Sequence, residues 1–313
     1  MTNFEVKNFL RPVRRRCERT APSLNAMLTR RLATDPHFIV GCGRSGTTLL
    51  GRILSSEPRF RYREEPRAYW HFIDERTDEI GLFTATCQLR LTNADVTNRN
   101  LQRRHVCRPL MWSRVDTCIL DKTPAHVFRL HWLAALFPTA KFIHLVRNPG
   151  DVVESIKRRS AAPLYNVTPA KSANQWWGRN EQKKQLLGDL LVERYGVAGM
   201  CAIDDDRIAA IVEWFLSAES ALTFGKHYPC RILHVRYEDL CSGQIETLSH
   251  VLDFLHISES RQVEYAFRRF ARIAANTHLL SLQEGDIAIE LIAEIERISC
   301  MFGYEISAKY RGG

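Results

Sequence analysis

The sequence predicts an α/β fold with three layers, in which a central parallel sheet is flanked by helices. Short apolar runs alternate along the chain with longer amphipathic segments, the arrangement typical of parallel strands joined by helices. The length of 313 residues suits one large domain, with two domains as the alternative, and a content of 45% hydrophobic and 25% charged residues is that of a globular protein. Such sheets bind ligands beyond the carboxyl ends of their strands.

Four apolar runs have the length and composition of buried strands. They are residues 37–40, 118–120, 141–146 and 231–235. Helices are expected between and after them, with spacing that places apolar residues on one face. They are residues 47–56, a helix through Leu136, a helix to about Arg159 that Asp151 can cap, and residues 207–226, 244–255 and 287–301. Residues 59–67 are predicted to be a polar, charge-dense connector.

The domain organisation follows from breaks in this pattern. Residues 1–36 form a basic N-terminal extension that ends at Asp35-Pro36, and residues 37–308 form a single domain. Residues 68–115 and 160–206 are less regular, and we expect them to be helical or lid insertions. Trp176 and Trp177 lie in the second of these; if they are on a helix they point to different faces, so at least one of them packs in the core.

Composition restricts the class of partner. The chain has 44 Lys and Arg against 35 Asp and Glu, a net charge of +9, which suits an anionic ligand, a nucleic acid or a membrane surface. The nine cysteines are scattered without a C-x-x-C pair, which favours reduced thiols in the cytoplasm and indicates no metal site. We expect no transmembrane segment, since no apolar run approaches the roughly 20 residues needed to span a bilayer.

The most informative segment follows the first strand. Residues 41–48 read Gly-Cys-Gly-Arg-Ser-Gly-Thr-Thr, nearly the phosphate-binding P-loop G-x-x-x-x-G-K-[ST]. Thr47 occupies the position of the P-loop lysine, and the positive charge sits earlier, at Arg44. Glycines let the backbone close around an anion, and the helix N-terminus supplies unpaired N–H donors. The segment therefore predicts a P-loop-like fold that binds a phosphate-bearing donor other than ATP or GTP.

Two motifs together resemble the sulfotransferases that use 3′-phosphoadenosine 5′-phosphosulfate (PAPS). Residues 43–49 resemble the loop that binds the 5′-phosphosulfate, and residues 142–156 resemble the strand and turn that bind the 3′-phosphate. The resemblance implies PAPS as the co-substrate and no metal. It implies these nucleotide-binding residues: Gly43, Arg44, Ser45, Gly46, Thr47, Thr48, Arg147 and Ser155.

Residues 62–67, Tyr-Arg-Glu-Glu-Pro-Arg, resemble the Glu-Glu-x-Arg segment of tyrosylprotein sulfotransferases. The resemblance implies that Glu65 is the catalytic base and Arg67 its electrostatic partner. It also implies that Lys122, in Asp-Lys-Thr-Pro, stabilises the leaving oxygen with Arg44. Two alternatives remain open: Glu65 is a solvated surface carboxylate, or the base is His126.

Two other functions compete with sulfuryl transfer to an acceptor hydroxyl. The P-loop-like spacing also fits a nucleotide kinase or NTPase, although the lysine is absent and no acidic strand end for Mg²⁺ is obvious. The basic charge also fits a non-catalytic module for anionic polymers, although no nucleic-acid motif is present. The acceptor is expected to be a tyrosine-type hydroxyl, a saccharide or a small molecule. We expect no nucleic-acid partner, and the sequence does not indicate an oligomeric state.

Overall fold

A computed structural model of the chain describes residues 35–111, 117–168, 171–196, 203–258, 260–271, 278–283 and 287–309. Its centre is a five-stranded sheet in the order β2-β3-β1-β4-β7, with every neighbouring pair parallel. The strands are β1 (His37–Val40), β2 (Phe60–Glu64), β3 (Cys118–Lys122), β4 (Phe142–Val146) and β7 (Ile232–Arg236). The predicted parallel α/β sheet is confirmed. The predicted N-terminal extension lies almost wholly outside the described residues.

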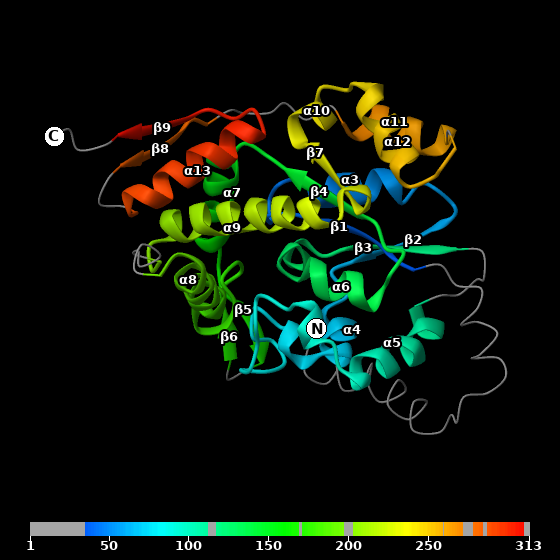
Figure 1. Cartoon of the computed structure of the whole chain (residues 1–313), viewed down its shortest axis with the longest axis horizontal. Helices are drawn as coiled ribbons and strands as arrows, with labels where there is room; N and C mark the ends of the chain where they lie inside the picture. The colour runs from blue at the N-terminus through cyan, green and yellow to red at the C-terminus, as the bar shows by residue number, and fades with distance from the viewer. Residues whose placement is uncertain are drawn as a thin grey trace.

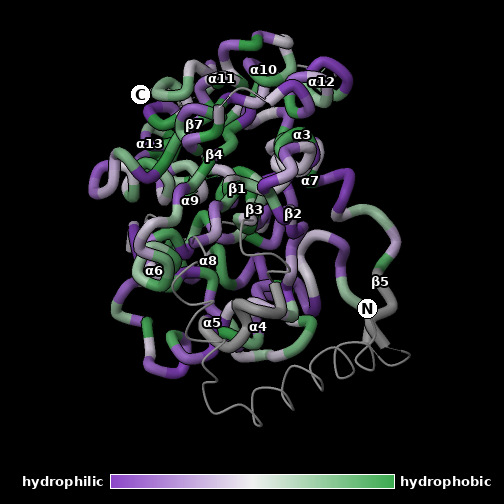
Figure 2. The backbone as a smooth tube through the Cα atoms, turned by 90° about the vertical axis from the view of Figure 1, so that its right-hand side faces the viewer, coloured by the Kyte–Doolittle hydropathy of each residue, from purple (hydrophilic) through white to green (hydrophobic). Residues whose placement is uncertain are grey.

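Helices cover both faces of the sheet (Figure 1). Successive side chains of a strand point to opposite faces, so Ile39 packs in one apolar cluster and its neighbours Phe38 and Val40 in another. The Ile39 face is covered by α3 (Thr47–Leu54), α10 (Tyr237–Cys241), α11 (Ile245–Phe254) and α12 (Arg261–Phe270). The opposite face is covered by α6 (Leu130–Leu136), α7 (Pro149–Ser160) and α9 (Asp206–His227). In Figure 2 the hydrophobic strands β1 and β4 lie enclosed between these layers.

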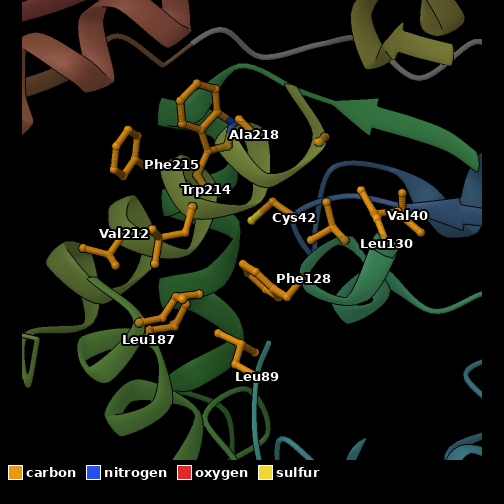
Figure 3. Close-up of a cluster of buried hydrophobic side chains, with 14 of the residues drawn as sticks. Val40, Cys42, Leu89, Phe128, Leu130, Leu187, Val212, Trp214, Phe215 and Ala218 are labelled. Carbon is orange, nitrogen blue, oxygen red and sulfur yellow. The ribbon is translucent and has the colours of Figure 1, made fainter. Parts of the chain in front are cut away.

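The larger cluster extends well beyond the sheet. Figure 3 shows Cys42, in the P-loop-like segment, close to Phe128 and to side chains of α9 such as Trp214, with Val40 beside Leu130. By length and composition α9 could cross a membrane, but 78% of its most apolar window is buried in this structure, as in a core helix. Asp205 begins α9 by accepting hydrogen bonds from the N–H groups of Arg207 and Ile208.

Peripheral elements complete the chain. They are α4 (Arg67–Ile73), α5 (Asn98–Met111), α8 (Gln182–Tyr195), α13 (Ile289–Met301), the hairpin β5 (Tyr165–Thr168) with β6 (Lys171–Ala173), the parallel pair β8 (Leu280–Gln283) with β9 (Ile306–Lys309), and the 3-10 turns η1 (Glu75–Thr77), η2 (Asn93–Asp95), η3 (Pro124–Arg129), η4 (Arg179–Glu181) and η6 (Pro229–Arg231). Of the two segments expected to be insertions, residues 68–115 contain most of α4 and all of α5, and residues 160–206 contain the β5–β6 hairpin and α8.

Two local predictions were wrong. Residues 60–64 form the edge strand β2 rather than a connector; only its first residue, Phe60, is buried, and charged side chains are tolerated at a sheet edge. Asn148, not Asp151, caps α7, because its side chain accepts a hydrogen bond from the Asp151 N–H. Trp176 and Trp177 lie in a turn closed by a bridge between Asn174 and Gly178, not on a helix. Trp177 is fully buried, as expected for one of the two.

Candidate functional site

The predicted site residues lie at the carboxyl ends of four adjacent strands. The P-loop-like segment follows β1, Glu65 follows β2, Lys122 ends β3 and Arg147 follows β4. The two neighbours of β1 in the sheet, β3 and β4, come later in the chain and lie on opposite sides of it. This is the topological switch point at which parallel sheets bind ligands. The fold therefore brings together residues that are up to about a hundred positions apart.

Glycines allow the loop after β1 to pack tightly. Gly46 precedes α3 with φ of 90°, and a Cβ atom there would lie 2.3 Å from the Tyr237 ring. A Cβ atom on Gly43 would lie 2.1 Å from the ring of Trp176. Ser45 is fully buried, and its Oγ has no hydrogen-bond partner among the described residues. A buried hydroxyl without a partner and free N–H groups at the start of α3 suit a bound anion.

Arg44 carries the charge of this loop. Its backbone is left-handed, with φ of 70°, and its Nε donates to Ser155 Oγ at 3.1 Å. The two motifs are thus in direct contact. Burial lowers the pKa of Arg44, and the nearby Arg159, Arg147 and Arg158 lower it further. In the described part of the chain no carboxylate forms an ion pair with Arg44, so its charge is available to an anion.

Arg147 lies beside Arg44. Its Nη1 donates to the carbonyl oxygen of Arg44 at 3.4 Å, and its Nη2 contacts Asp151 Oδ2 at 3.3 Å. Its guanidinium stacks on the ring of Tyr237, 4.5 Å from the centroid, and its buried Nε has no partner within the described ranges. Asp151 also accepts hydrogen bonds from His278, which brings a C-terminal segment to this motif.

Glu65 is held from two sides. Arg67 Nη2 donates to its Oε2 at 3.0 Å, and Lys122 Nζ donates to its Oε1 at 2.7 Å. Burial raises the pKa of Glu65, but Arg67 and then Lys122 outweigh burial and hold the pKa below its ordinary value. The backbone of Glu65 is also in the left-handed region, with φ of 44°, although residues that precede a proline, as Glu65 precedes Pro66, favour an extended backbone. Strain of this kind costs about 1–3 kcal/mol and concentrates at functional sites.

Lys122 links the carboxylates to the loop. Its Nζ also lies 3.2 Å from Oε1 of Glu64, which accepts a hydrogen bond from Thr48 Oγ1 at 3.3 Å. The lysine side chain is only 2% exposed, so both glutamates compensate a charge that burial would otherwise penalise. Lys122 and Glu65 are thereby placed at the same end of the sheet as Arg44.

His126 is a core residue in this structure. It is fully buried, its ring packs edge-on against Phe38 and Trp70, and burial lowers its pKa far below the ordinary value. Neither of its ring nitrogens has a hydrogen-bond partner among the described residues. A histidine enclosed in this way does not reach an acceptor at the strand ends. A second histidine, His144 on β4, is hydrogen-bonded to His234 in the core.

Sequence reasoning missed the residues that support the site. Glu79 and Arg129 extend the ion pairs behind Arg67, Tyr237 supports Arg147, and Trp176 covers Gly43. No spacing signal connects them to the motifs, because each contact joins segments that are distant in sequence. Within the described ranges, no group of three or more His, Cys, Asp or Glu side chains is placed to hold a metal ion.

Comparison with known proteins shows what the chain is similar to. The profile of the sulfotransferase family matches residues 36–185, which include every predicted site residue. Protein-tyrosine sulfotransferase of Drosophila melanogaster is 27% identical over 145 residues, 45% of this chain and 29% of that protein. Protein-tyrosine sulfotransferase 1 of Mus musculus is 28% identical over 147 residues, 45% of this chain and 39% of that protein. The resemblance to sulfotransferases is confirmed, although the chain spans well under half the length of these relatives.

Solved structures support the fold. The sulfotransferase domain of the Synechococcus PCC 7002 olefin synthase has a TM-score of 0.50 and 19% identity, covering 87% of this chain and 97% of that domain. The sulfotransferase domain from the curacin biosynthetic pathway has a TM-score of 0.52 and 18% identity, covering 87% and 99%. The likeness therefore extends beyond the matched segment, at the level of the fold.

Proposed function

We propose that this protein is a sulfotransferase that moves a sulfuryl group from PAPS to an acceptor hydroxyl. One arrangement carries the proposal: Arg44, Ser155 and Arg147 meet at the phosphate loop, and Glu65 lies at the same strand ends, held by Lys122 and Arg67. The first group suits a donor with two phosphate-bearing ends. The second suits a base that removes a proton from the acceptor. The sulfotransferase relatives support the same reaction class.

The donor side supplies charge and N–H groups. In this proposal the start of α3 and Arg44 bind the 5′-phosphosulfate, while Arg147 and Ser155 bind the 3′-phosphate, since a guanidinium can hold two phosphate oxygens at once. Ser45 Oγ and Arg147 Nε, which have no hydrogen-bond partner in the described part of the chain, are consistent with a polyanionic ligand. Negative charge grows on the bridging oxygen of the departing nucleotide, and fixed donors aimed at it lower the barrier.

The transfer itself requires one proton acceptor. The acceptor oxygen forms a bond to sulfur, the bond from sulfur to the bridging phosphate oxygen breaks, and the electron pair stays with adenosine 3′,5′-bisphosphate. Glu65 takes the hydroxyl proton. As Lys122 turns from Glu65 toward the leaving oxygen, Glu65 loses a cation that lowers its pKa and becomes a stronger base. Donor binding would thus prepare the base.

The kinase or NTPase alternative is not favoured. On β3, which pairs with β1, the acidic residue near the carboxyl end is Asp121, and it is fully buried. Its carboxylate accepts hydrogen bonds from Trp70 Nε1 at 3.0 Å and Thr123 Oγ1 at 2.7 Å, and burial raises its pKa to about 7. A carboxylate occupied in this way is a poor ligand for Mg²⁺.

The test is transfer of label from ³⁵S-labelled PAPS to a panel of tyrosine peptides, saccharides and small phenols. We expect label in one acceptor class, with no need for Mg²⁺, and none with the Glu65→Gln variant. Magnesium-dependent ATP turnover without label transfer would replace the proposal with the NTPase reading. Salt-sensitive binding of anionic polymers without affinity for PAPS would favour the binding module.

A further inference from the structure

Behind Glu65 lies a chain of alternating charges that becomes buried with distance from it. It runs from Glu65 to Arg67 at the start of α4, then to Glu79 after η1, and ends at Arg129 on η3. The side chain of Glu79 is 4% exposed and that of Arg129 is 1% exposed. Three segments that are distant in sequence are therefore joined by ion pairs; the inner end is buried, whereas the side chains of Arg67 and Glu65 are 29% and 32% exposed.

The contacts divide the Arg67 guanidinium between two carboxylates. Its Nη2 is 3.0 Å from Glu65 Oε2, and its Nη1 is 2.5 Å from Glu79 Oε1. The other oxygen of Glu79 faces both terminal nitrogens of Arg129, each at 3.4 Å. Arg129 is fixed in turn by the carbonyl oxygen of Gln88, at 3.0 Å. Arg67 therefore cannot approach Glu65 more closely without releasing Glu79.

A purely structural role is a weak explanation for this chain. Buried ion pairs stabilise a fold little more than apolar packing of the same volume, because both charges lose their hydration. Burial raises the pKa of Glu79, yet Arg67 and Arg129 outweigh it and the pKa falls to about 2. Glu79 thus remains charged at every physiological pH and acts continuously on Arg67.

We infer that Glu79 and Arg129 are positioning residues that set, through Arg67, how strongly the candidate base Glu65 is held. The inference rests on the proposed function, since it concerns the base of that reaction. Glu79 competes with Glu65 for the positive charge of the Arg67 guanidinium. Arg129 weakens this competition because it partly neutralises Glu79. Neither residue touches the reacting atoms in this arrangement.

The two residues act on Glu65 with opposite signs. The charged and titratable groups near Glu65 are Arg67 from α4, Lys122 and Asp121 from β3, Tyr62 and Glu64 from β2, and Arg44 from the loop. Glu79→Gln leaves more of the Arg67 charge on Glu65, so the pKa of Glu65 falls. Arg129→Met leaves Glu79 less neutralised, so Glu79 competes more strongly for Arg67. The charged form of Glu65 is then less stabilised, and its pKa rises.

The experiment measures the acid limb of the pH profile of kcat for sulfuryl transfer. In Glu79→Gln we expect this limb to move down by about 1 pH unit and kcat to fall about 3- to 10-fold, because the base is weaker, while KM for PAPS changes less than about twofold. In Arg129→Met we expect the limb to move up by a similar amount. Arg129→Lys keeps the charge and should leave the limb near that of the unmodified protein.

Glu57→Gln is the matched control. Glu57 is also a buried carboxylate paired with an arginine, Arg59, but it lies outside the chain that leads to Glu65. Its substitution should lower thermal stability without moving the pH limb. Unchanged limbs in both test variants, or shifts in the same direction, would overturn the inference.

A second measurement does not depend on turnover. NMR titration of ¹³C-labelled glutamate side chains, with Glu65 assigned by Glu65→Gln, reports the pKa of Glu65 directly in each folded variant. Shifts of the Glu65 pKa in opposite directions in Glu79→Gln and Arg129→Met would support the inferred role of Glu79 and Arg129, even if no acceptor is sulfated. If no acceptor is sulfated, only the proposed function fails. Identical Glu65 titrations in all variants would refute the pair while leaving the proposed function intact.

Discussion

The two halves of the candidate site handle charge in opposite ways. On the donor side, Arg44 and Arg147 lie against each other, and the pKa of Arg44 is lowered by burial and by neighbouring arginines. On the base side, charges alternate from Lys122 through Glu65 and Arg67 to Glu79, and each is compensated by its neighbour. The donor side accumulates positive charge in the folded chain, whereas on the base side each positive charge is compensated by a neighbouring carboxylate.

This difference indicates what each half is built to do. Like charges held together are costly unless something external compensates them, so the donor side is suited to a polyanion. Compensated charges fix a geometry, so the base side is suited to hold one carboxylate in place. Substitutions on the donor side should mainly change affinity, whereas substitutions on the base side should mainly change rate.

The largest expected effect is that of Glu65→Gln. Loss of the proton acceptor should lower kcat by about 10²- to 10⁴-fold, while the affinity for adenosine 3′,5′-bisphosphate stays nearly unchanged. Label transfer from PAPS and calorimetry with the bisphosphate measure the two quantities separately. If His126→Ala removes turnover in a folded protein and Glu65→Gln does not, the base has been assigned to the wrong residue.

Arg147→Ala should have the converse effect. Removing a charged phosphate contact should weaken bisphosphate binding by about 10- to 100-fold, with a much smaller change in kcat at saturating PAPS. Arg268→Ala controls for net charge, since Arg268 is exposed and paired with Glu264 on α12. An equal loss of affinity in both variants would mean that the donor side acts only through overall charge.

Gly46→Ala tests the packing beneath the donor side. The added Cβ would displace the Tyr237 ring, on which Arg147 stacks, so we expect about a 10-fold loss of bisphosphate affinity together with lower thermal stability. Gly243 also has a left-handed backbone, with φ of 75°, but no atom within 4 Å of an added Cβ. Gly243→Ala should therefore lower stability alone. A matching loss of bisphosphate affinity in this variant would mean that displacement of the Tyr237 ring does not explain the effect of Gly46→Ala.

The smallest effect concerns the sheet beneath both halves. His144 on β4 and His234 on β7 are bonded through their Nδ1 atoms at 2.9 Å. Burial lowers the pKa of His234 to about 4 and that of His144 well below its ordinary value. The unfolded chain therefore binds more protons below about pH 6.5. His234 alone should lower the free energy of unfolding by roughly 2–3 kcal/mol as the pH drops to 4, and His144 should add to this fall.

Urea unfolding across this pH range measures that dependence. His234→Gln keeps a hydrogen-bonding side chain beside His144 but removes one titrating group, so the slope of stability against pH should become shallower. A slope equal to that of the unmodified protein would assign the acid sensitivity to other groups, such as His37, whose pKa burial also lowers to about 4.

Much of the fold could be predicted because its main strands are short apolar runs with clear breaks. Strands β1, β3, β4 and β7 were found in this way, since their buried side chains leave a signal in composition. The edge strand β2 was missed because its pattern of Arg61, Arg63 and Glu64 reads as a loop. Pairs β5–β6 and β8–β9 were missed for a similar reason, because two-stranded pairs leave too short a pattern to recognise.

The candidate site was predictable only where residues follow one another in a motif. Arg44, Glu65 and Arg147 were found from local sequence, and the structure places them at adjacent strand ends; their roles remain predictions. Glu79 and Arg129 could not be found, because a buried ion pair depends on contacts that no spacing encodes. Neither could the left-handed backbone of Glu65, which is held by the hydrogen bond from its N–H to the carbonyl oxygen of Lys122 on β3.

Calorimetric titration with adenosine 3′,5′-bisphosphate is the direct test of whether the site binds a donor with two phosphate-bearing ends. We expect binding at least about tenfold tighter than that of adenosine 5′-monophosphate, since the 3′-phosphate adds a charged contact, and we expect Arg147→Ala to remove this difference. No heat of binding at millimolar bisphosphate, or equal affinity for both nucleotides in the unmodified protein, would contradict this expectation.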